Sequence, residues 1–108
     1  STVSLELCMF DKPVINVGYN PPVDIRPKDY SLYYNFDHYK PVVASGGVQV
    51  AWSEADMKRL LAEAFTDPQK DSAKRRALVT QMFGNTLDGK VSSRVAATLQ
   101  LLAQRHAK

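Results

Sequence analysis

The sequence predicts an incomplete α/β domain, in which a short parallel sheet is followed by three C-terminal helices. Two short apolar segments rich in β-branched residues, 14–19 and 48–52, are typical of the buried strands of a parallel sheet. Segments with helical periodicity surround them, one before the first strand and three after the second. A chain of 108 residues has room for one domain with a modest core.

The first ten residues predict a short helix. Ser1 or Thr2 is suited to cap it, and Glu6 lies one turn after Thr2 on the same helical face. The helix is expected to end at 11–13, because Pro13 cannot continue it and favours extended geometry in the residue before it. A helix, a tight break and a buried strand make up half of a βαβ unit.

The segment between the two strands contains a loop and an aromatic cluster. Residues 20–28 hold three prolines and show no periodicity, which predicts a loop. Residues 30–39 hold five of the ten aromatic side chains. These rings are suited either to cover the open end of the sheet or to stack on a base or a sugar.

The first helix after the sheet is predicted from its cap and its spacing. Ser53 is suited to cap it, and the dipeptide Asp67-Pro68 is expected to end it. Apolar residues recur at i, i+3, i+4, i+7 and i+8, which predicts a buried face. These residues are Met57, Leu60, Leu61, Ala64 and Phe65.

Two further helices are predicted in the C-terminal part. The first of them runs over 71–83 and closes at Gly84 in the manner of a C-cap, with its basic triplet 74–76 on a solvated face. The second runs over about 92–105. Its inward-facing residues are expected to be Val95, Leu99 and Leu102.

Two strands do not complete a doubly wound sheet, which typically has about five or six. The sequence therefore predicts an incomplete Rossmann-like half-domain, cut inside a βαβ unit. Because the chain opens with Ser1-Thr2 rather than Met and the first helix begins at once, we expect an upstream part to be missing. Such a cut leaves a sheet edge and an apolar face uncovered, so a homodimer is among the expected partners.

Composition and charge exclude several classes of function. The formal net charge of +3, from 14 basic and 11 acidic residues, is small and dispersed, so no nucleic-acid partner is expected. Cys8 is the single cysteine, which excludes an internal disulfide and a cysteine-based zinc site. We expect Cys8 to be an unreactive thiol in the core. The low cysteine count favours a cytoplasmic location. No apolar stretch is long enough to span a membrane, and no metal or cofactor motif is present.

The start of the first predicted helix is one candidate site. A helix N-terminus offers unpaired N–H groups and a partial positive charge, which favour phosphate oxygens. The hydroxyls of Ser1 and Thr2 add donors there, and the Glu6 carboxylate is suited to accept hydrogen bonds from two ribose hydroxyls. The alternative is an ordinary N-cap followed by a solvated glutamate.

His38 is a second candidate. It follows Asp37 within the aromatic cluster, and an Asp–His pair can orient an imidazole for proton transfer. Adjacent side chains usually point apart, so the alternative is a histidine that is packed and hydrogen-bonded among the tyrosines.

Several motifs, in the same order, resemble segments of one enzyme family. The run STVSLELCMFDKPVINVGY (1–19) is similar to the "S-T-x-x-x-E, then G/D-K-P-V-I" segment in the C-terminal domain of GT-B glycosyltransferases, and to the related stretch of the CDP-glycerol glycerophosphotransferase group. Residues 46–68 resemble the strand, S-x-x-x-L helix and D-P run that follow it. Residues 87–96, LDGKVSSRVA, are similar to the DG-x-A-S-x-R tail of the same enzymes.

The resemblance implies that residues 1–108 form a partial C-terminal domain that binds the nucleotide-diphosphate part of an activated sugar, or CDP-glycerol. Ser1 and Thr2 would meet the donor diphosphate and Glu6 the nucleotide ribose, without a metal or another cofactor. The N-terminal domain, which is absent, would be a partner and would supply any catalytic base, so the isolated chain is expected to be inactive. The last helix would pack toward that domain, and peripheral membrane association of the parent enzyme is an accompanying expectation.

The alternative is a small non-catalytic protein-interaction module. Segment 30–39 would then be the partner surface, and the basic helices would steer association. The enzyme interpretation requires that the coding sequence continuous with Ser1 encode further strand–helix repeats and a glycine-rich loop.

Overall fold

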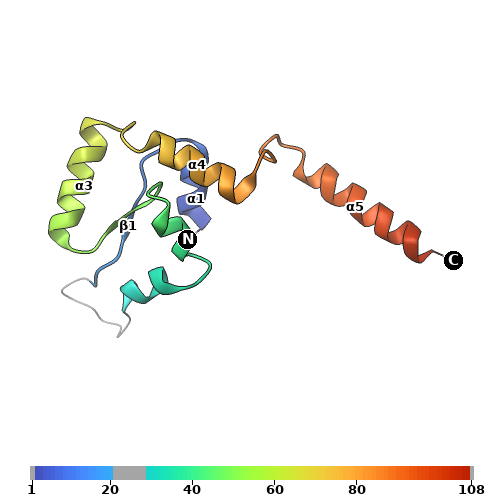
Figure 1. The fold of residues 1–108 in the computed structure, drawn as a ribbon, viewed down its shortest axis with the longest axis horizontal. Coiled ribbons are helices and arrows are strands. Elements are labelled where there is room, and N and C mark those ends of the chain that lie inside the picture. The colour runs from blue at the N-terminus through green and yellow to red at the C-terminus, as the bar shows by residue number, and fades with distance from the viewer. Residues whose placement is uncertain (1, 21–28, 108) are drawn as a thin grey trace.

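A computed structural model describes residues 2–20 and 29–107, and the loop predicted over 20–28 lies, except for Asn20, outside the described residues. The fold is mixed α/β and mostly helical (Figure 1). In chain order its elements are α1 (Thr2–Met9), β1 (Ile15–Val17), the 3₁₀ helix η1 (Tyr30–Asn35), α2 (Lys40–Ala44), β2 (Gln49–Ala51), α3 (Glu54–Thr66), α4 (Ser72–Phe83) and α5 (Val91–His106).

The prediction of a short parallel sheet is confirmed. β1 and β2 run parallel, with Ile15 opposite Gln49 and Val17 opposite Ala51. Each strand has three residues, fewer than the predicted segments. Among the described residues each strand pairs only with the other, so the outer edge of each strand lacks a partner strand.

Two short helices, η1 and α2, lie in the crossover between the strands, where the sequence reasoning assigned no helix. The Asp29 carboxylate caps η1, accepting hydrogen bonds from Ser31 N at 3.0 Å and from Ser31 Oγ at 2.6 Å. Pro41 stands in the first turn of α2, where its missing N–H is not needed. Because parallel strands cannot be joined by a tight hairpin, such a crossover is required.

α1 ends in a Schellman turn that leads directly into β1. Lys12 N donates to Leu7 O at 3.1 Å and Asp11 N to Cys8 O at 3.0 Å, which is the bonding pattern of that motif. Asp11 takes the left-handed position with a φ of 53°, where glycine is usual and aspartate is tolerated. The predicted end of the helix at 11–13 is confirmed.

The Asp11 carboxylate is held by α4. Its oxygens accept hydrogen bonds from Ser72 Oγ at 2.7 Å and from Arg75 Nε at 2.9 Å, and these contacts lower the pKa of Asp11, the bond from Ser72 most of all. Arg75 also donates to the carbonyl oxygens of Asp11 at 3.3 Å and of Pro68 at 2.8 Å.

The side chain of Arg75 is only 3% exposed. The prediction of a solvated face for the triplet 74–76 is therefore wrong at Arg75, although Lys74 and Arg76 are exposed. A guanidinium can be buried at low cost only where a carboxylate and carbonyl oxygens satisfy it, and here Asp11 and Pro68 supply them.

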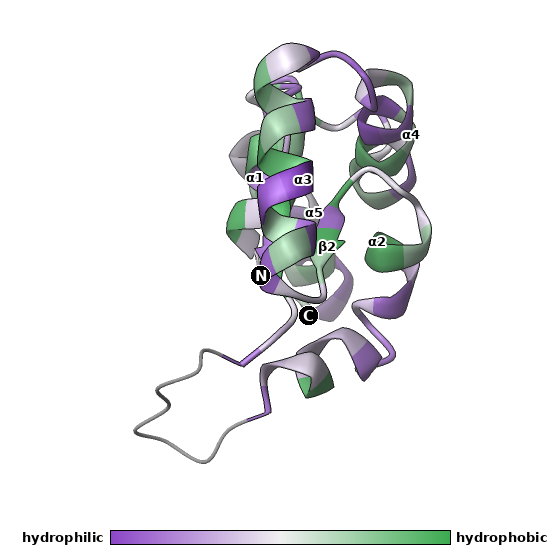
Figure 2. Ribbon diagram, turned by 90° about the vertical axis from the view of Figure 1, so that its left-hand side faces the viewer, coloured by the Kyte–Doolittle hydropathy of each residue, from purple (hydrophilic) through white to green (hydrophobic). Residues whose placement is uncertain are grey.

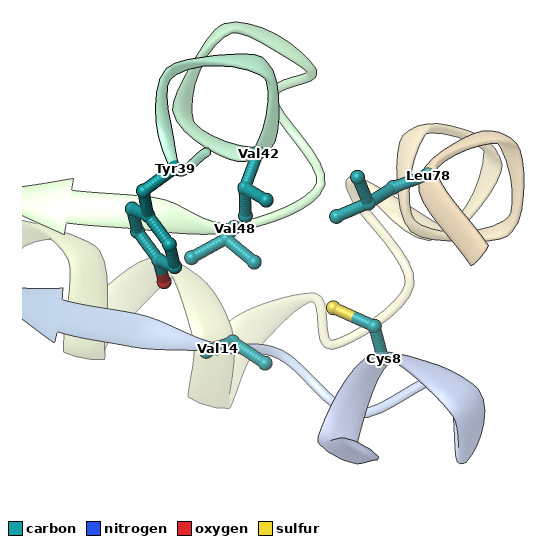
Figure 3. Packing of buried hydrophobic residues seen from close by; sticks show 6 residues of the cluster. All are labelled: Cys8, Val14, Tyr39, Val42, Val48 and Leu78. Carbon is teal, nitrogen blue, oxygen red and sulfur yellow. The ribbon is translucent and has the colours of Figure 1, made fainter. Parts of the chain in front are cut away.

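The core lies where α1, α4 and the segment around α2 meet the sheet (Figure 3). The thiol of Cys8 lies 3.8 Å from Gly47 O, and burial raises its pKa, which confirms the expected core cysteine. A Cβ at Gly47 would lie 3.0 Å from Lys74 O, so the glycine permits the close approach of α4. The buried cluster consists of Cys8, Val14, Tyr39, Val42, Val48 and Leu78.

Both predicted ends of α3 are confirmed. Ser53 Oγ accepts a hydrogen bond from Asp56 N at 3.1 Å, and the helix ends before Asp67-Pro68. Leu60 is buried on the side of the sheet, but Phe65 is 86% exposed, so the predicted apolar face is covered only in part. Figure 2 shows hydrophobic and hydrophilic residues alternating along α3.

α5 extends away from the rest of the molecule (Figure 1). Gly84 closes α4 with a φ of 57°, as predicted, and the chain then turns into α5. Arg94 ties the first part of α5 to this turn through the Asp88 carboxylate at 2.8 Å and Thr86 O at 2.8 Å.

The apolar stripe of α5 does not face inward. Val95, Leu99 and Leu102 are 53%, 60% and 45% exposed, so the expectation of an inner face is wrong within this chain. The reason is geometric, because α5 departs from the body at its first turn and none of the other described elements lies over it.

Leu78→Ala is expected to lower the free energy of unfolding by about 2–5 kcal/mol, because it opens a cavity at a fully buried position. Urea unfolding followed by circular dichroism measures the change. The matched control is Leu99→Ala, whose exposed side chain should keep the variant within about 0.5 kcal/mol of the parent chain. Equal losses in the two variants would mean that α5 is packed in solution, contrary to this fold.

Asp11→Asn removes the charge but keeps a residue that tolerates the left-handed conformation. Because native contacts lower the pKa of Asp11, its contribution to stability is complete above about pH 4 and is lost as the pH falls through the lower native pKa. We therefore expect the variant to be less stable than the parent near neutral pH, with a difference that shrinks below about pH 4.

Urea unfolding at neutral and acidic pH measures this difference. Asp37→Asn is the control, because the Asp37 side chain is 98% exposed and its pair with Lys40 contributes little. A stability difference between Asp11→Asn and the parent that is the same at every pH would contradict the assignment.

Candidate functional site

A chain of hydrogen bonds joins α1 and β1 to Tyr39, the residue that precedes α2. Ser4 Oγ, in the first turn of α1, donates to Asn16 Oδ1 at 2.8 Å, and Asn16 Nδ2 donates to the Tyr39 hydroxyl at 2.7 Å. Cys8, one turn later in α1, lies instead near Gly47, before β2 begins. α1 therefore runs antiparallel to β1, and its first turn reaches the edge where α/β sheets bind ligands.

An open pocket lies beside this network, and we call it the aromatic pocket. The Tyr34 hydroxyl donates to Val17 O at 2.6 Å, and Tyr34 meets Trp52 edge-on at 5.4 Å between ring centroids. Burial raises the pKa of Tyr34, so its hydroxyl stays protonated. The aromatic pocket has a volume of about 400 Å³ and is lined by Asn16, Val17, Tyr30, Tyr33, Tyr34, Phe36, His38 and Tyr39.

The predicted donor-binding residues lie on α1. Ser1 lies outside the described residues, while Thr2 is the first residue of α1 and is exposed. Glu6 is exposed as well, one turn from Thr2 and on the side opposite to the buried residues Ser4 and Cys8. Thr2 and Glu6 are thus brought to one accessible face, and their roles toward a donor stay predictions.

His38 lies at the aromatic pocket and is exposed. Its ring stacks on Phe36, with centroids 5.8 Å apart and an interplanar angle of 17°. The Asp37 carboxylate accepts a hydrogen bond from Lys40 Nζ at 2.9 Å rather than orienting the imidazole. The Asp–His arrangement suggested by the sequence is therefore not formed, and the imidazole serves as a wall of the pocket.

α1 also carries an uncovered apolar flank. Val3 and Leu7 on α1, and Phe10 directly after it, recur at i, i+4 and i+7 and are 58%, 40% and 74% exposed. The prediction that an apolar face is left uncovered is confirmed on this helix. Such a flank is typical of a surface that another segment or another molecule covers.

Two other kinds of site are absent from the described part of the chain. It contains no group of three or more His, Cys, Asp or Glu side chains that could hold a metal ion. None of its helices has both the length and the apolar character needed to cross a bilayer.

Comparisons of the chain with protein-family models, with curated proteins and with solved structures give no match.

Asn16 and Tyr39 are the central residues of the site that sequence reasoning missed. A signal for Asn16 was available, because it is the polar residue inside the apolar strand segment 14–17 and a polar side chain there needs partners. Tyr39 had no such signal, since nothing in its local sequence separates it from the other tyrosines of the cluster.

Tyr39→Phe is expected to lower the free energy of unfolding by about 1–3 kcal/mol, because it deprives the partly buried Asn16 amide of its acceptor. Chemical denaturation measures the loss. Tyr33→Phe is the matched control. Because Tyr33 is 47% exposed, this variant should have nearly the same free energy of unfolding as the parent chain. If the two variants have the same free energy of unfolding, the hydrogen bond between Asn16 and Tyr39 does not stabilise the site.

Proposed function

We propose that the chain is the incomplete, Rossmann-like, C-terminal donor-binding domain of a GT-B-type transferase. Its ligand would be the nucleotide-diphosphate part of an activated sugar, or CDP-glycerol. The observation that carries the proposal is the position of the first turn of α1 at the carboxyl edge of two parallel strands, fixed by the bond from Ser4 to Asn16.

The diphosphate would be bound by groups that this turn offers to solvent. The free N–H groups at the start of α1 and the Thr2 hydroxyl are suited to its oxygens, and Ser1 would add a second hydroxyl. The exposed Glu6 carboxylate would accept hydrogen bonds from the ribose hydroxyls. Catalysis would then rest on electrostatic stabilisation of the diphosphate leaving group, with no metal or cofactor required.

The reaction itself would need the rest of the parent enzyme. Displacement at the anomeric carbon of a sugar donor, or at phosphorus of CDP-glycerol, requires an acceptor and a base to receive its proton. In the proposal the N-terminal domain of the parent enzyme would help bind the acceptor and would supply the base. The 108-residue chain alone is therefore expected to transfer no sugar, and measurable transfer by it would contradict the assignment of an incomplete domain.

A non-catalytic interaction module is the second candidate. It is favoured by the uncovered apolar residues of α5 and by the exposed aromatic residues of segment 30–39, which are surfaces typical of protein contacts. This candidate does not explain the position of α1. It requires no nucleotide binding, which separates it from the transferase.

Calorimetric titration of the chain with UDP and with CDP tests the proposal. Glu6→Ala should weaken the binding free energy by about 1–3 kcal/mol, because ribose hydroxyls lose a charged acceptor. Glu54→Ala is the matched control, since Glu54 is an exposed carboxylate that pairs with Lys58 at 3.0 Å on α3. Unchanged affinity in Glu6→Ala would remove Glu6 from the site, and failure of both nucleotides to bind would favour the interaction module.

A further inference from the structure

We propose that the aromatic pocket binds an uncharged pyranose ring. The pocket lies at the carboxyl edge of the strands, and with about 400 Å³ it has the size of a small-ligand site. The inference goes beyond the proposed function and does not depend on nucleotide binding, because it rests on the lining residues of the pocket alone.

The charge of the lining selects a neutral ligand. None of the described residues that line the pocket is a Lys, Arg, Asp or Glu. Among these described residues an anion would find no lysine or arginine and a cation no carboxylate, and the neighbouring Asp37 carboxylate is already paired with Lys40 at 2.9 Å.

The polar groups of the lining select a ligand that forms hydrogen bonds. Four of the lining residues are tyrosines, and Asn16 and His38 add an amide and an imidazole. Asn16, Tyr34 and Tyr39 already form hydrogen bonds within the protein, so a ligand would bond chiefly to the hydroxyls of Tyr30 and Tyr33 and to the imidazole of His38. A purely apolar ligand would desolvate these groups without giving them partners, which costs free energy, whereas the hydroxyls of a pyranose ring can bond to them.

The rings of the lining differ in orientation. Tyr33 and Phe36 meet at 82° and Tyr34 and Tyr39 at 59°, whereas Tyr30 stacks on Tyr33 at 28° and Phe36 on His38 at 17°. A flat base stacks best against one face parallel to its own, as in single-stranded nucleic-acid sites. The C–H groups of a pyranose chair can contact an aromatic face while its equatorial hydroxyls reach neighbouring polar groups, which suits a lining of mixed orientation.

Two rings of the pocket are held in place and two are more accessible. Tyr34 is held by its bond to Val17 O at 2.6 Å, and Tyr39 by its bond from Asn16 at 2.7 Å, so these two rings are positioned before a ligand arrives. Tyr33 and Phe36 are 47% and 48% exposed, so part of each ring is accessible to an entering ligand.

Fluorescence of Trp52, the single tryptophan, provides a reporter because its ring contacts Tyr34 of the pocket. The probes are methyl β-D-glucopyranoside and methyl α-D-galactopyranoside, with uridine, tetramethylammonium chloride and inorganic phosphate for comparison. We expect a saturable change with at least one glycoside at millimolar concentration and none with the other probes. Binding of uridine alone, or no saturable change with either glycoside, would overturn the proposal.

Variants separate ring stacking from a general effect on the fold. Tyr33→Ala should raise the dissociation constant about five- to tenfold, because an aromatic contact is lost, whereas Tyr33→Phe keeps the ring and should raise it less than Tyr33→Ala does. Phe65→Ala is the matched control, an exposed aromatic residue outside the pocket, and should bind as the parent does.

Circular dichroism confirms that each variant is folded before it is titrated. Equal loss of binding in Tyr33→Ala and Phe65→Ala, or no loss in Tyr33→Ala, would refute the assignment of the pocket. If glycosides bind while UDP and CDP do not, the pocket inference stands and the transferase proposal fails, so the two are distinguished by the same set of titrations.

Discussion

The ion pair between Asp11 and Arg75 is the contact on which the rest of the arrangement depends. It holds the end of α1 against α4 and occupies the turn that sends the chain into β1. The C-terminal end of α1 is fixed by this pair. Because α1 runs antiparallel to β1, its N-terminal end lies toward the carboxyl end of the strand. A guanidinium buried without such a carboxylate would destabilise the fold strongly, so the pair constrains the orientation of α1 against α4.

Hydrogen bonds connect α1, held by this ion pair, to the residues at the edge of the sheet. Ser4 meets the amide of Asn16, and Asn16 in turn meets Tyr39, which belongs to the buried core and also lines the aromatic pocket. A shift of α1 would therefore disturb the first turn and the pocket together. The two proposed ligand sites share one support although their ligands differ in charge and shape.

Sequence reasoning succeeded where the signal was local. The cap at Ser53, the break at Pro13 and the close at Gly84 each depend on neighbouring residues, and the structure has all three. The partner of Arg75 lies 64 residues away, so its burial could not be read from a basic triplet. The 3₁₀ helix had a local signal that was overlooked, because Tyr30, Tyr33 and Phe36 recur every three residues, the period of that helix.

The candidate site was predictable only in its parts. The helix that carries Thr2 and Glu6 follows from the opening residues, and the aromatic segment was visible from composition. Their meeting at one edge depends on the register of β1 against β2 and on the Asn16 amide, which are long-range properties. The inward face assigned to α5 was wrong because amphipathic spacing shows that a helix has an apolar stripe, not what lies against it.

The exposure of α5 along its length has a consequence for its behaviour in water. A helix of 16 residues is close to the length at which a nucleated helix in isolation is only marginally favoured over coil. Without tertiary cover its amide protons exchange with solvent at rates set by helix–coil opening, not by global unfolding. The C-terminal segment therefore forms a separate and weaker cooperative unit, which a partner surface can order without any change in the core.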